Sequence, residues 1–316
     1  MADDVVVVGA GVSGLTTAIL LAESGLQTTV LAREAPRDTT SAAAGALWGP
    51  SFQPPFDKTL EWTARSLGVF QRLAEDDTTG VRIADVLTVG DAMPGGDELP
   101  PQVALIPGLR AATGDELPDG FAGGSWGRMP VVDMPTYLDH LQRRLAKAGG
   151  KIEHADVEDL TTTGADRVVN AAGVGARRLA GDRTVRPVFG QHVVLTNPGL
   201  AHVFMELGRG DEWASFMPHR DRVVCGGVRI EGRDDRTPDD DITERILARC
   251  RAVEPRLRDA RVVEVVTGLR PERPAVRVER ERRGGVTIVH NYGHGSTGVS
   301  LSWGCAHDAA ALVGSG

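Results

Sequence analysis

Near its start the chain has a run of four valines, Val5 to Val8, that leads directly into the glycine-rich sequence GAGVSG at residues 9–14. Residues 15–22 then continue without proline or internal glycine, as an opening helix does. A second apolar stretch follows at residues 28–32. This order predicts a buried strand, a tight turn, a helix and a second strand.

Four later segments have the apolar spacing or the end signals of helices. Residues 59–74 repeat apolar side chains on one face, and residues 135–148 do so between an early proline and Gly149. Residues 237–253 open with a capping threonine, a proline in the first helical position and three aspartates. We interpret these aspartates as helix-capping residues at the positive end of the dipole, not as metal ligands. Residues 299–313 form the last predicted helix.

Strand-like patterns of two kinds occupy much of the remaining chain. From residue 80 to 127, short pieces alternate with Pro and Gly, and we expect a second domain to begin here. Residues 151–157 and 167–173 resume the parallel type of strand. Residues 187–196 and 222–229 are instead typical of an antiparallel sheet.

The segments between and after these strands are predicted from their turn residues. Residues 211–218 are expected to form a loop. Residues 261–266 are strand-like and deliver the sequence TGLRPERP at residues 267–274. Residues 277–283 and 286–292 favour a hairpin closed by two glycines.

Composition and charge exclude several classes of protein. At 316 residues the chain can bury a full core, and its net charge of -8 argues against nucleic acid as the main partner. Cys225, Cys250 and Cys305 are widely spaced without a CxxC pair, so we expect three reduced thiols and no zinc site. No apolar run reaches the roughly 18 residues of a membrane span. The acidic start and the absence of a peroxisomal address at the end favour a cytoplasmic location.

The glycine-rich sequence indicates a dinucleotide site. Gly9 would permit the tight turn, Gly11 the close approach of a pyrophosphate, and Gly14 the packing of the helix on the strand. Glu34 lies about 20 residues beyond Gly14, where a carboxylate accepts hydrogen bonds from the adenosine ribose. A glycine-rich turn without a ligand and a solvated surface glutamate are the alternatives, and Arg33 would instead suit the 2′-phosphate of NADP.

Two further stretches of small residues stand where a ligand could approach the backbone. Residues 38–50 read DTTSAAAGALWGP, either a second loop against the cofactor or an ordinary helix start. The strand at residues 167–173 ends in Ala171-Ala172-Gly173, at an edge of the sheet where ligands cross. His290 and His294 are four residues apart, but they flank Asn-Tyr-Gly and not a helical turn, so no metal site is predicted.

Five motifs occur in the same order as in the D-amino acid oxidases: GAGVSG, TTSAAAGALWGP, VVNAAGVGARRL, TGLRPERP and IVHNYGHGSTGVSLSWGCA. The chain therefore resembles that family over nearly its full length. The resemblance implies an α/β fold in which a Rossmann-like FAD-binding domain is interleaved with an α+β substrate domain built on a mainly antiparallel sheet. The FAD-binding domain would comprise residues 1–50, 136–185 and 262–316, and the substrate domain residues 51–135 and 186–261.

The resemblance also implies FAD, bound non-covalently by residues from most parts of the chain. Those serving the adenosine end and the pyrophosphate would be Gly9, Gly11, Val12, Ser13, Gly14, Arg33, Glu34 and Val157. Those serving the pyrophosphate and the flavin would be Ala43, Ala44, Gly45, Leu47, Ala172, Gly173, Arg270, His294, Gly295, Gly298, Val299 and Ser300. The acid of the family lies about one place before Glu34, where this chain has Arg33.

The residue to which the resemblance assigns the substrate is Arg270. A planar guanidinium with parallel N–H donors suits an α-carboxylate, and this grip would decide which hydrogen on Cα faces flavin N5. The backbone carbonyl of Ser296 would accept the substrate amino group. The Cα hydrogen would then pass as hydride to the flavin, and the imino acid would hydrolyse to a 2-oxo acid and ammonia while dioxygen becomes hydrogen peroxide.

One departure from the family concerns the substrate pocket. Family members usually carry a tyrosine before an Ile-Ile-Pro-like strand, and Ser215 stands in its place here, near Trp213. Either Ser215 replaces the lost hydrogen bond while Trp213 closes the site, or Arg270 alone holds the carboxylate of a less usual substrate. Gly49 also leaves room where the family often has a polar side chain.

The leading hypothesis is an FAD-dependent oxidase that deaminates a D-amino acid with dioxygen as the acceptor. The alternatives are a flavin oxidase of the same fold for glycine, an N-substituted or a specialised amino acid, an NAD(P)-linked reductase, and a non-catalytic flavin-binding protein. The expected partners are small molecules, with neither nucleic acid nor a membrane, and a homodimer is left open.

Overall fold

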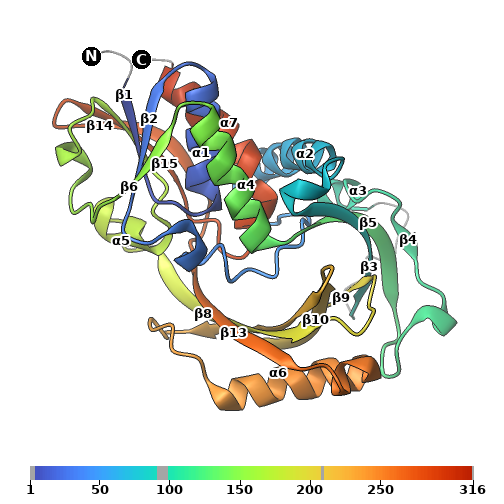
Figure 1. The fold of residues 1–316 in the computed structure, drawn as a ribbon. Coiled ribbons are helices and arrows are strands. Elements are labelled where there is room, and N and C mark those ends of the chain that lie inside the picture. The colour runs from blue at the N-terminus through green and yellow to red at the C-terminus, as the bar shows by residue number, and fades with distance from the viewer. Residues whose placement is uncertain (1–3, 91–98, 208–209, 315–316) are drawn as a thin grey trace.

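The structure is a computed structural model that describes residues 4–90, 99–207 and 210–314. Within these ranges the strands form two sheets, one of six strands and one of nine. Figure 1 shows the six-stranded sheet near both ends of the chain and the nine-stranded sheet beyond it, with segments crossing between them. The predicted α/β fold, with one largely parallel and one mainly antiparallel sheet, is confirmed.

The six-stranded sheet has the order β14-β15-β7-β1-β2-β6, and its neighbours are parallel except for the β14–β15 pair. Its strands are β1 (Asp4–Val8), β2 (Gln27–Ala32), β6 (Lys151–His154), β7 (Arg167–Asn170), β14 (Arg277–Arg283) and β15 (Val286–Tyr292). Val5 and Val7 pack into one apolar cluster, and Val6 and Val8 into another. Because both faces of β1 are covered, every position in this valine run is apolar.

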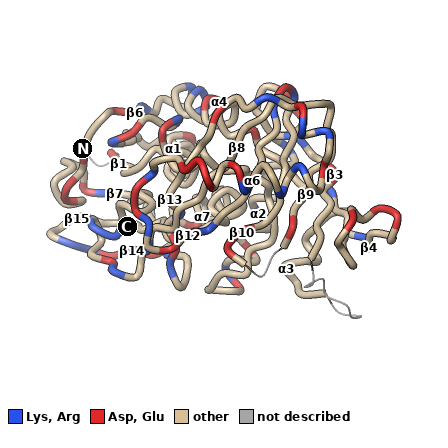
Figure 2. The backbone as a smooth tube through the Cα atoms, turned by 90° about the horizontal axis from the view of Figure 1, so that it is seen from below, with Lys and Arg blue, Asp and Glu red and all other residues tan. Residues whose placement is uncertain are grey.

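The edge strand β14 confirms the predicted hairpin, since it runs antiparallel to β15 along its whole length. Gly284 and Gly285 form the turn with φ of 57° and 86°, a backbone region that suits glycine in a two-residue hairpin loop. Acidic and basic residues are mixed along β14, as they are over most of the molecule in Figure 2. Charges on an exposed edge discourage pairing with another strand.

The nine-stranded sheet has the order β12-β8-β11-β10-β9-β3-β5-β4, with β13 paired to β8. Its strands are β3 (Val81–Val89), β4 (Arg110–Ala111), β5 (Gly124–Val132), β8 (Arg186–Thr196), β9 (Val203–Glu206), β10 (Glu212–Pro218), β11 (Arg222–Val228), β12 (Ile230–Glu231) and β13 (Val262–Glu272). The strand β13 continues through the TGLR motif, so Arg270 lies on a strand of this sheet. The domain limits stay a prediction. They place residues 262–272 in the FAD-binding domain, whereas β13 pairs with β8 of the nine-stranded sheet.

Two expectations about this sheet are wrong. Residues 211–218 are not a loop, because most of them form β10, which pairs with β9 and β11. The pieces expected between residues 80 and 127 include the long strands β3 and β5, which pair along nine positions. The prolines and glycines of this region lie mainly in the connection between β3 and β5, and for this reason the sequence pattern predicted only short strands.

The predicted helices are confirmed within a few residues of their expected ends. The helices are α1 (Val12–Glu23), α2 (Phe56–Leu73), α3 (Pro101–Ala104), α4 (Met134–Lys147), α5 (Ala176–Leu179), α6 (Asp240–Val253) and α7 (Gly298–Gly314). Short 3-10 helices span Pro36–Asp38, Asp77–Thr79, Gly114–Glu116, Leu160–Thr162, Gly173–Gly175 and Pro255–Arg258. Figure 1 shows α1, α4 and α7 gathered beside the six-stranded sheet and α6 below the other sheet.

The predicted cap of α6 is wrong by two residues. Asp239, not Thr237, is the N-cap, and its side chain accepts a hydrogen bond from the amide of Ile242 at 3.1 Å. The helix therefore begins at Asp240 and leaves Thr237 in the preceding segment. Aspartate caps as well as threonine does, so the sequence alone did not decide between them.

The helices α2 and α7 approach each other closely at Gly304. A Cβ on Gly304 would overlap the backbone of Trp62, and the amide of Gly304 donates to the Ser66 hydroxyl at 3.0 Å. This contact fixes α7, whose first turn faces the central cavity of the molecule.

We therefore predict that Gly304→Ala lowers the free energy of unfolding by about 1 to 3 kcal/mol, because a methyl group does not fit between the two backbones. Urea unfolding followed by circular dichroism measures the change. Gly68→Ala is the matched control on α2, since its Cβ would meet only the end of Arg72 at 3.7 Å. The control should gain up to about 1 kcal/mol from helix propensity, and equal effects at the two positions would contradict the prediction.

Candidate functional site

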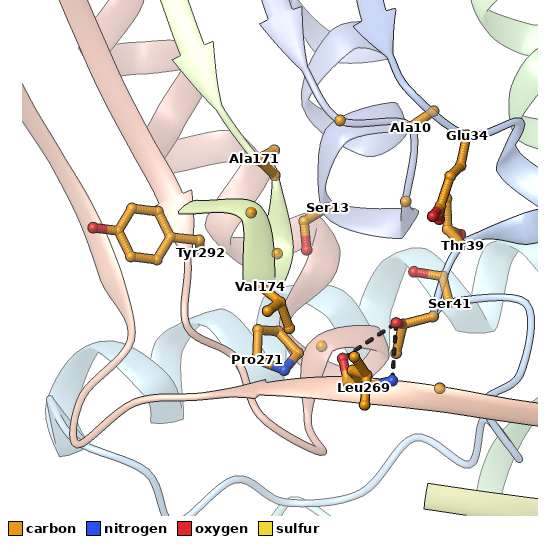
Figure 3. Close-up of a pocket in the computed structure, with 18 of the residues that line it drawn as sticks. Ala10, Ser13, Glu34, Thr39, Ser41, Ala171, Val174, Leu269, Pro271 and Tyr292 are labelled. Carbon is orange, nitrogen blue, oxygen red and sulfur yellow. Dashed lines mark hydrogen bonds between the residues drawn. The ribbon is translucent and has the colours of Figure 1, made fainter. Parts of the chain in front are cut away.

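A cavity of about 580 Å³ lies between the carboxyl ends of β1, β2 and β7 and the face of the nine-stranded sheet near β8 and β13. Figure 3 shows side chains from distant parts of the chain meeting around it. The predicted site residues on its wall are Gly9, Gly11, Val12, Ser13, Arg33, Glu34, Ala43, Ala44, Val157, Ala172, Gly173, Arg270, His294, Gly295, Ser296, Gly298 and Val299. The structure thus brings most of the predicted set to one place.

The glycine-rich turn forms one wall. Gly9 has φ of 113°, and a Cβ there would overlap the carbonyl oxygen of Ala171 on the neighbouring strand end. A Cβ on Gly14 would overlap Gly9, so Gly14 allows α1 to begin directly on the strand. The first turn of α1 opens toward the cavity, where its amides and dipole favour an anion.

Sequence reasoning missed the hydroxyl residues of this wall. The Ser41 hydroxyl accepts a hydrogen bond from the amide of Val12 at 3.0 Å. The Thr40 hydroxyl accepts from the amide of Leu269 and donates to its carbonyl, both at 3.2 Å, and dashed lines mark these two bonds at Leu269 in Figure 3. Both residues lie in the TTSAAAG stretch, where the alanines and the glycine were taken as the signal and the hydroxyls were passed over.

The adenosine end expected from the sequence is occupied by charged groups. Glu34 meets the guanidinium of Arg236, with Nη2 to Oε1 at 2.8 Å and Nη1 to Oε2 at 3.3 Å. Nη2 of Arg33 lies 3.7 Å from Oε1 of Glu34, and the Arg33 side chain is 65% exposed. On the cavity wall nearby, the carbonyl of Val157 accepts from Arg178 Nη2 at 3.0 Å. Arg236 was missed because its partner is 202 residues away and no local pattern marks it.

Arg270 lies flat on the sheet. Its side chain covers Gly190, where a Cβ would come within 2.5 Å of the guanidinium. Nη1 donates to the carbonyls of Phe189 at 3.2 Å and Val228 at 3.0 Å. Nε and Nη2 make no hydrogen bond with the described residues, and no carboxylate among them forms an ion pair with Arg270.

A buried guanidinium without an acid is costly, and burial lowers the pKa of Arg270 accordingly. An arginine nevertheless stays protonated in proteins. The edge formed by Nε and Nη2 therefore presents two parallel donors and a positive charge, which suits a carboxylate.

His192 is a second residue that the sequence did not reveal. It lies on the cavity wall next to Arg270, and its Nδ1 donates to the carbonyl of Ala43 at 2.8 Å. Its ring covers Gly226, where a Cβ would come within 2.8 Å of Nε2. Burial, and then the charge of Arg270, lowers the pKa of His192 to about 4. The ring is therefore neutral at pH 7.

The C-terminal motif forms the far wall. His294 is buried between Asn291, whose Oδ1 lies 3.1 Å from Nε2, and Ser13, whose hydroxyl lies 3.5 Å from Nδ1. Burial lowers the pKa of His294 to about 4. The ring joins the turn before α7 to the first turn of α1, so both helix starts face the same cavity.

Six predicted site residues do not lie on the cavity wall: Gly14, Gly45, Leu47, Ser215, Trp213 and Ser300. The Ser300 hydroxyl accepts from the amide of Gly49 at 3.0 Å, which ties α7 to the 39–49 segment. Ser215 is buried within β10, and Trp213 packs against Gly227, because residues 212–218 form a central strand where a loop was expected. The catalytic roles assigned to Ser215 and Trp213 stay predictions.

The residues present fit a flavin dinucleotide. The glycine turn and the start of α1 leave a backbone cradle for phosphates, and Gly11 faces Ser41 so closely that a Cβ would come within 3.0 Å of its hydroxyl. The cavity continues from Glu34 at one end to Gly298 at the start of α7. Seventeen positions expected to contact FAD or substrate lie along it, as given above.

The comparisons with known proteins agree with this fit. The family described as FAD dependent oxidoreductase matches residues 4–312. The D-amino-acid oxidase of Rubrobacter xylanophilus is 46% identical over 312 residues, which are 98% of this chain and 95% of that protein. The D-amino-acid oxidase of Streptomyces coelicolor is 44% identical, covering 98% and 96%. Human D-aspartate oxidase is 34% identical, covering 98% and 94%.

Solved structures share the fold at lower sequence identity. The glycine oxidase from Geobacillus kaustophilus has a TM-score of 0.81 and 21% identity, with 98% of this chain and 94% of that chain covered. The matching family and the full-length relatives confirm both the resemblance and the FAD cofactor that were predicted from the motifs. The chain belongs to the family of FAD dependent oxidoreductases that includes the D-amino-acid oxidases.

Proposed function

We propose that the chain is an FAD-dependent D-amino-acid oxidase. It would convert a D-amino acid, water and dioxygen to a 2-oxo acid, ammonia and hydrogen peroxide. The observation that carries this proposal is Arg270, a largely buried cation on the cavity wall whose hydrogen bonds among the described residues go only to backbone carbonyls. The names of the relatives that are 44% and 46% identical support the same activity.

Arg270 binds and orients the substrate in this proposal. Its Nη1 is fixed by two carbonyls, which leaves the Nε–Nη2 edge to hold both oxygens of the α-carboxylate. Because the guanidinium rests on Gly190, it has little freedom to follow a misplaced substrate. Fixing the carboxylate restricts how Cα can present its hydrogen, and this positioning is the main contribution of the chain to the rate.

FAD, when bound, supplies the redox chemistry, since it accepts two electrons together with the Cα hydrogen and returns electrons to dioxygen. The Ser296 carbonyl is assigned the substrate amino group. Neither histidine on the wall is suited to hold a substrate proton at neutral pH, because burial, joined at His192 by the charge of Arg270, lowers the pKa of both rings to about 4. The substrate therefore has to enter the reaction with its amino group already neutral.

The finer parts of the prediction belong to the same proposal. Dioxygen as the acceptor, a cytoplasmic location and a homodimer rest on the sequence and on the resemblance. No helix within the described residues is long and apolar enough to cross a membrane.

The activity itself is tested with a panel of D-, L- and N-methyl amino acids and glycine. We expect peroxide-coupled turnover with several D-amino acids and none with their L-enantiomers. Peroxide formation is followed with a peroxidase dye, and the 2-oxo acid is identified by mass spectrometry. Turnover only with glycine or N-methyl substrates would replace this function with the alternative flavin oxidase.

For Arg270, we predict that Arg270→Ala lowers kcat/KM for the best D-amino acid by about 30-fold to several thousand-fold, equivalent to about 2 to 5 kcal/mol for a buried charged contact. FAD absorbance should persist, and binding of the 2-oxo acid product, read from the flavin spectrum, should weaken in parallel. Arg256→Ala is the control, because Arg256 is an exposed arginine paired with Glu254. Unchanged kinetics in Arg270→Ala would remove this residue from the site.

The pH dependence follows from the neutral histidines. Since the pKa values of His192 and His294 are lowered to about 4, both rings are neutral through the neutral range and add no ionisation there. We predict that kcat/KM rises with pH as the substrate ammonium loses its proton. Trifluoro-D-alanine, which has a less basic amine than D-alanine, should move the rise to lower pH. A rise at the same pH with both substrates would instead indicate a titrating group of the enzyme.

A further inference from the structure

The segment between β12 and α6 reaches from the nine-stranded sheet to the far end of the cavity. Asp234 and Arg236 in this segment lie on the cavity wall near Glu34. The Thr267 hydroxyl donates to the carbonyl of Arg236 at 2.6 Å. Arg236 Nη1 donates to the carbonyl of Asp38 at 2.8 Å. The segment therefore contacts both β13 and the connection that follows β2.

The segment is held in shape by contacts of its own. The guanidinium of Arg233 lies 4.0 Å from the centre of the Phe189 ring and forms ion pairs with Asp235 and Asp239. Asp235 in turn accepts from the amide of Thr237 at 2.9 Å. These contacts fix the backbone on both sides of Arg236, so its side chain is presented to Glu34 by a supported loop.

The Arg236–Glu34 pair is two-pronged and partly exposed. Both carboxylate oxygens meet the guanidinium, and the side chains are 38% and 29% exposed. Three of the five N–H donors of Arg236 are used by Glu34 and Asp38, and Nε makes no hydrogen bond with the described residues. Each oxygen of Glu34 also keeps a further lone pair. Both side chains thus retain capacity for a ligand.

We propose that Arg236 is a cofactor-binding residue that closes the adenosine end of the site. Its guanidinium fixes the Glu34 carboxylate for the hydroxyl groups of the ribose, and its remaining donors face the ADP half of FAD. The inference rests on the FAD site of the proposed function and adds to it a residue from the segment between β12 and α6. Glu34 follows β2 of one sheet and Arg236 follows β12 of the other, so their contact links the two parts of the molecule at this end of the cavity.

The test uses apoprotein prepared by removing FAD, with binding of FAD measured by quenching of flavin fluorescence. In Arg236→Ala the dissociation constant for FAD should rise by about 10- to 150-fold, the range of a hydrogen bond to a charged group. The dissociation constant for ADP, measured by competition with FAD, should rise by a similar factor. Binding of FMN, which lacks the adenosine half, should stay as in the wild type.

Two variants separate a contact with the cofactor from general loosening of the fold. Arg245→Ala is the matched control, because Arg245 lies on the nearby helix α6 and pairs with Glu212. It should leave all three dissociation constants unchanged. Arg236→Lys keeps the charge but loses the planar fork, so its FAD affinity should lie between the wild type and Arg236→Ala.

Salt tests the electrostatic part of the Arg236 contribution. A partly exposed ion pair is screened by ions, so raising sodium chloride should weaken FAD binding more in the wild type than in Arg236→Ala. Equal FAD and ADP affinities in wild type and Arg236→Ala would overturn the proposal, and so would an equal loss of FMN binding. Failure of the wild-type chain to bind FAD at all would instead reject the proposed function.

Discussion

The position of the reactive groups depends on a patch of the nine-stranded sheet that carries no side chains. Gly190 lies beneath the guanidinium of Arg270, Gly226 beneath the ring of His192, and Gly227 beneath Trp213. At each of these positions even a methyl group would collide with the larger side chain. Arg270 and His192 can therefore lie flat on the sheet and leave the cavity open beside them, while Trp213 packs away from the cavity wall.

This packing sets the electrostatics of the site. Arg270 can be largely buried because it rests on backbone and its Nη1 donates to two carbonyl oxygens, which satisfy one nitrogen but do not neutralise the charge. Arg229 nearby does have carboxylate partners, because its Nη2 lies 2.6 Å from Oε2 of Glu272 and 2.7 Å from Oε1 of Glu231. Burial, and then the charge of Arg270, lowers the pKa of His192 and keeps its ring neutral. Arg270 thus faces the cavity without a carboxylate partner among the described residues, as a consequence of how two adjacent strands are paired, and in the proposed function it binds the anionic group of the substrate.

Sequence reasoning succeeded where the signal is local. The valine run and glycine turn predicted the first strand, turn and helix because each property belongs to consecutive residues. The hairpin of β14 and β15 was equally local. It failed where partners are remote: β10 was taken as a loop because its strand character comes from β9 and β11 on either side. His192 and Arg236 are positioned by hydrogen bonds to Ala43 and Glu34, which lie 149 and 202 residues away in the sequence.

The contacts at the two ends of the cavity differ in how deeply they are buried, and this difference affects how the cofactor is held. At the end proposed for the flavin the contacts are buried, since His294 and Ser300 join α1, α7 and the 39–49 segment in the interior. At the adenosine end the joining group is the partly exposed Arg236–Glu34 pair. Local opening costs less where fewer buried contacts break. Exchange of the cofactor should therefore begin at the adenosine end, while the groups that orient the substrate stay in place around Arg270.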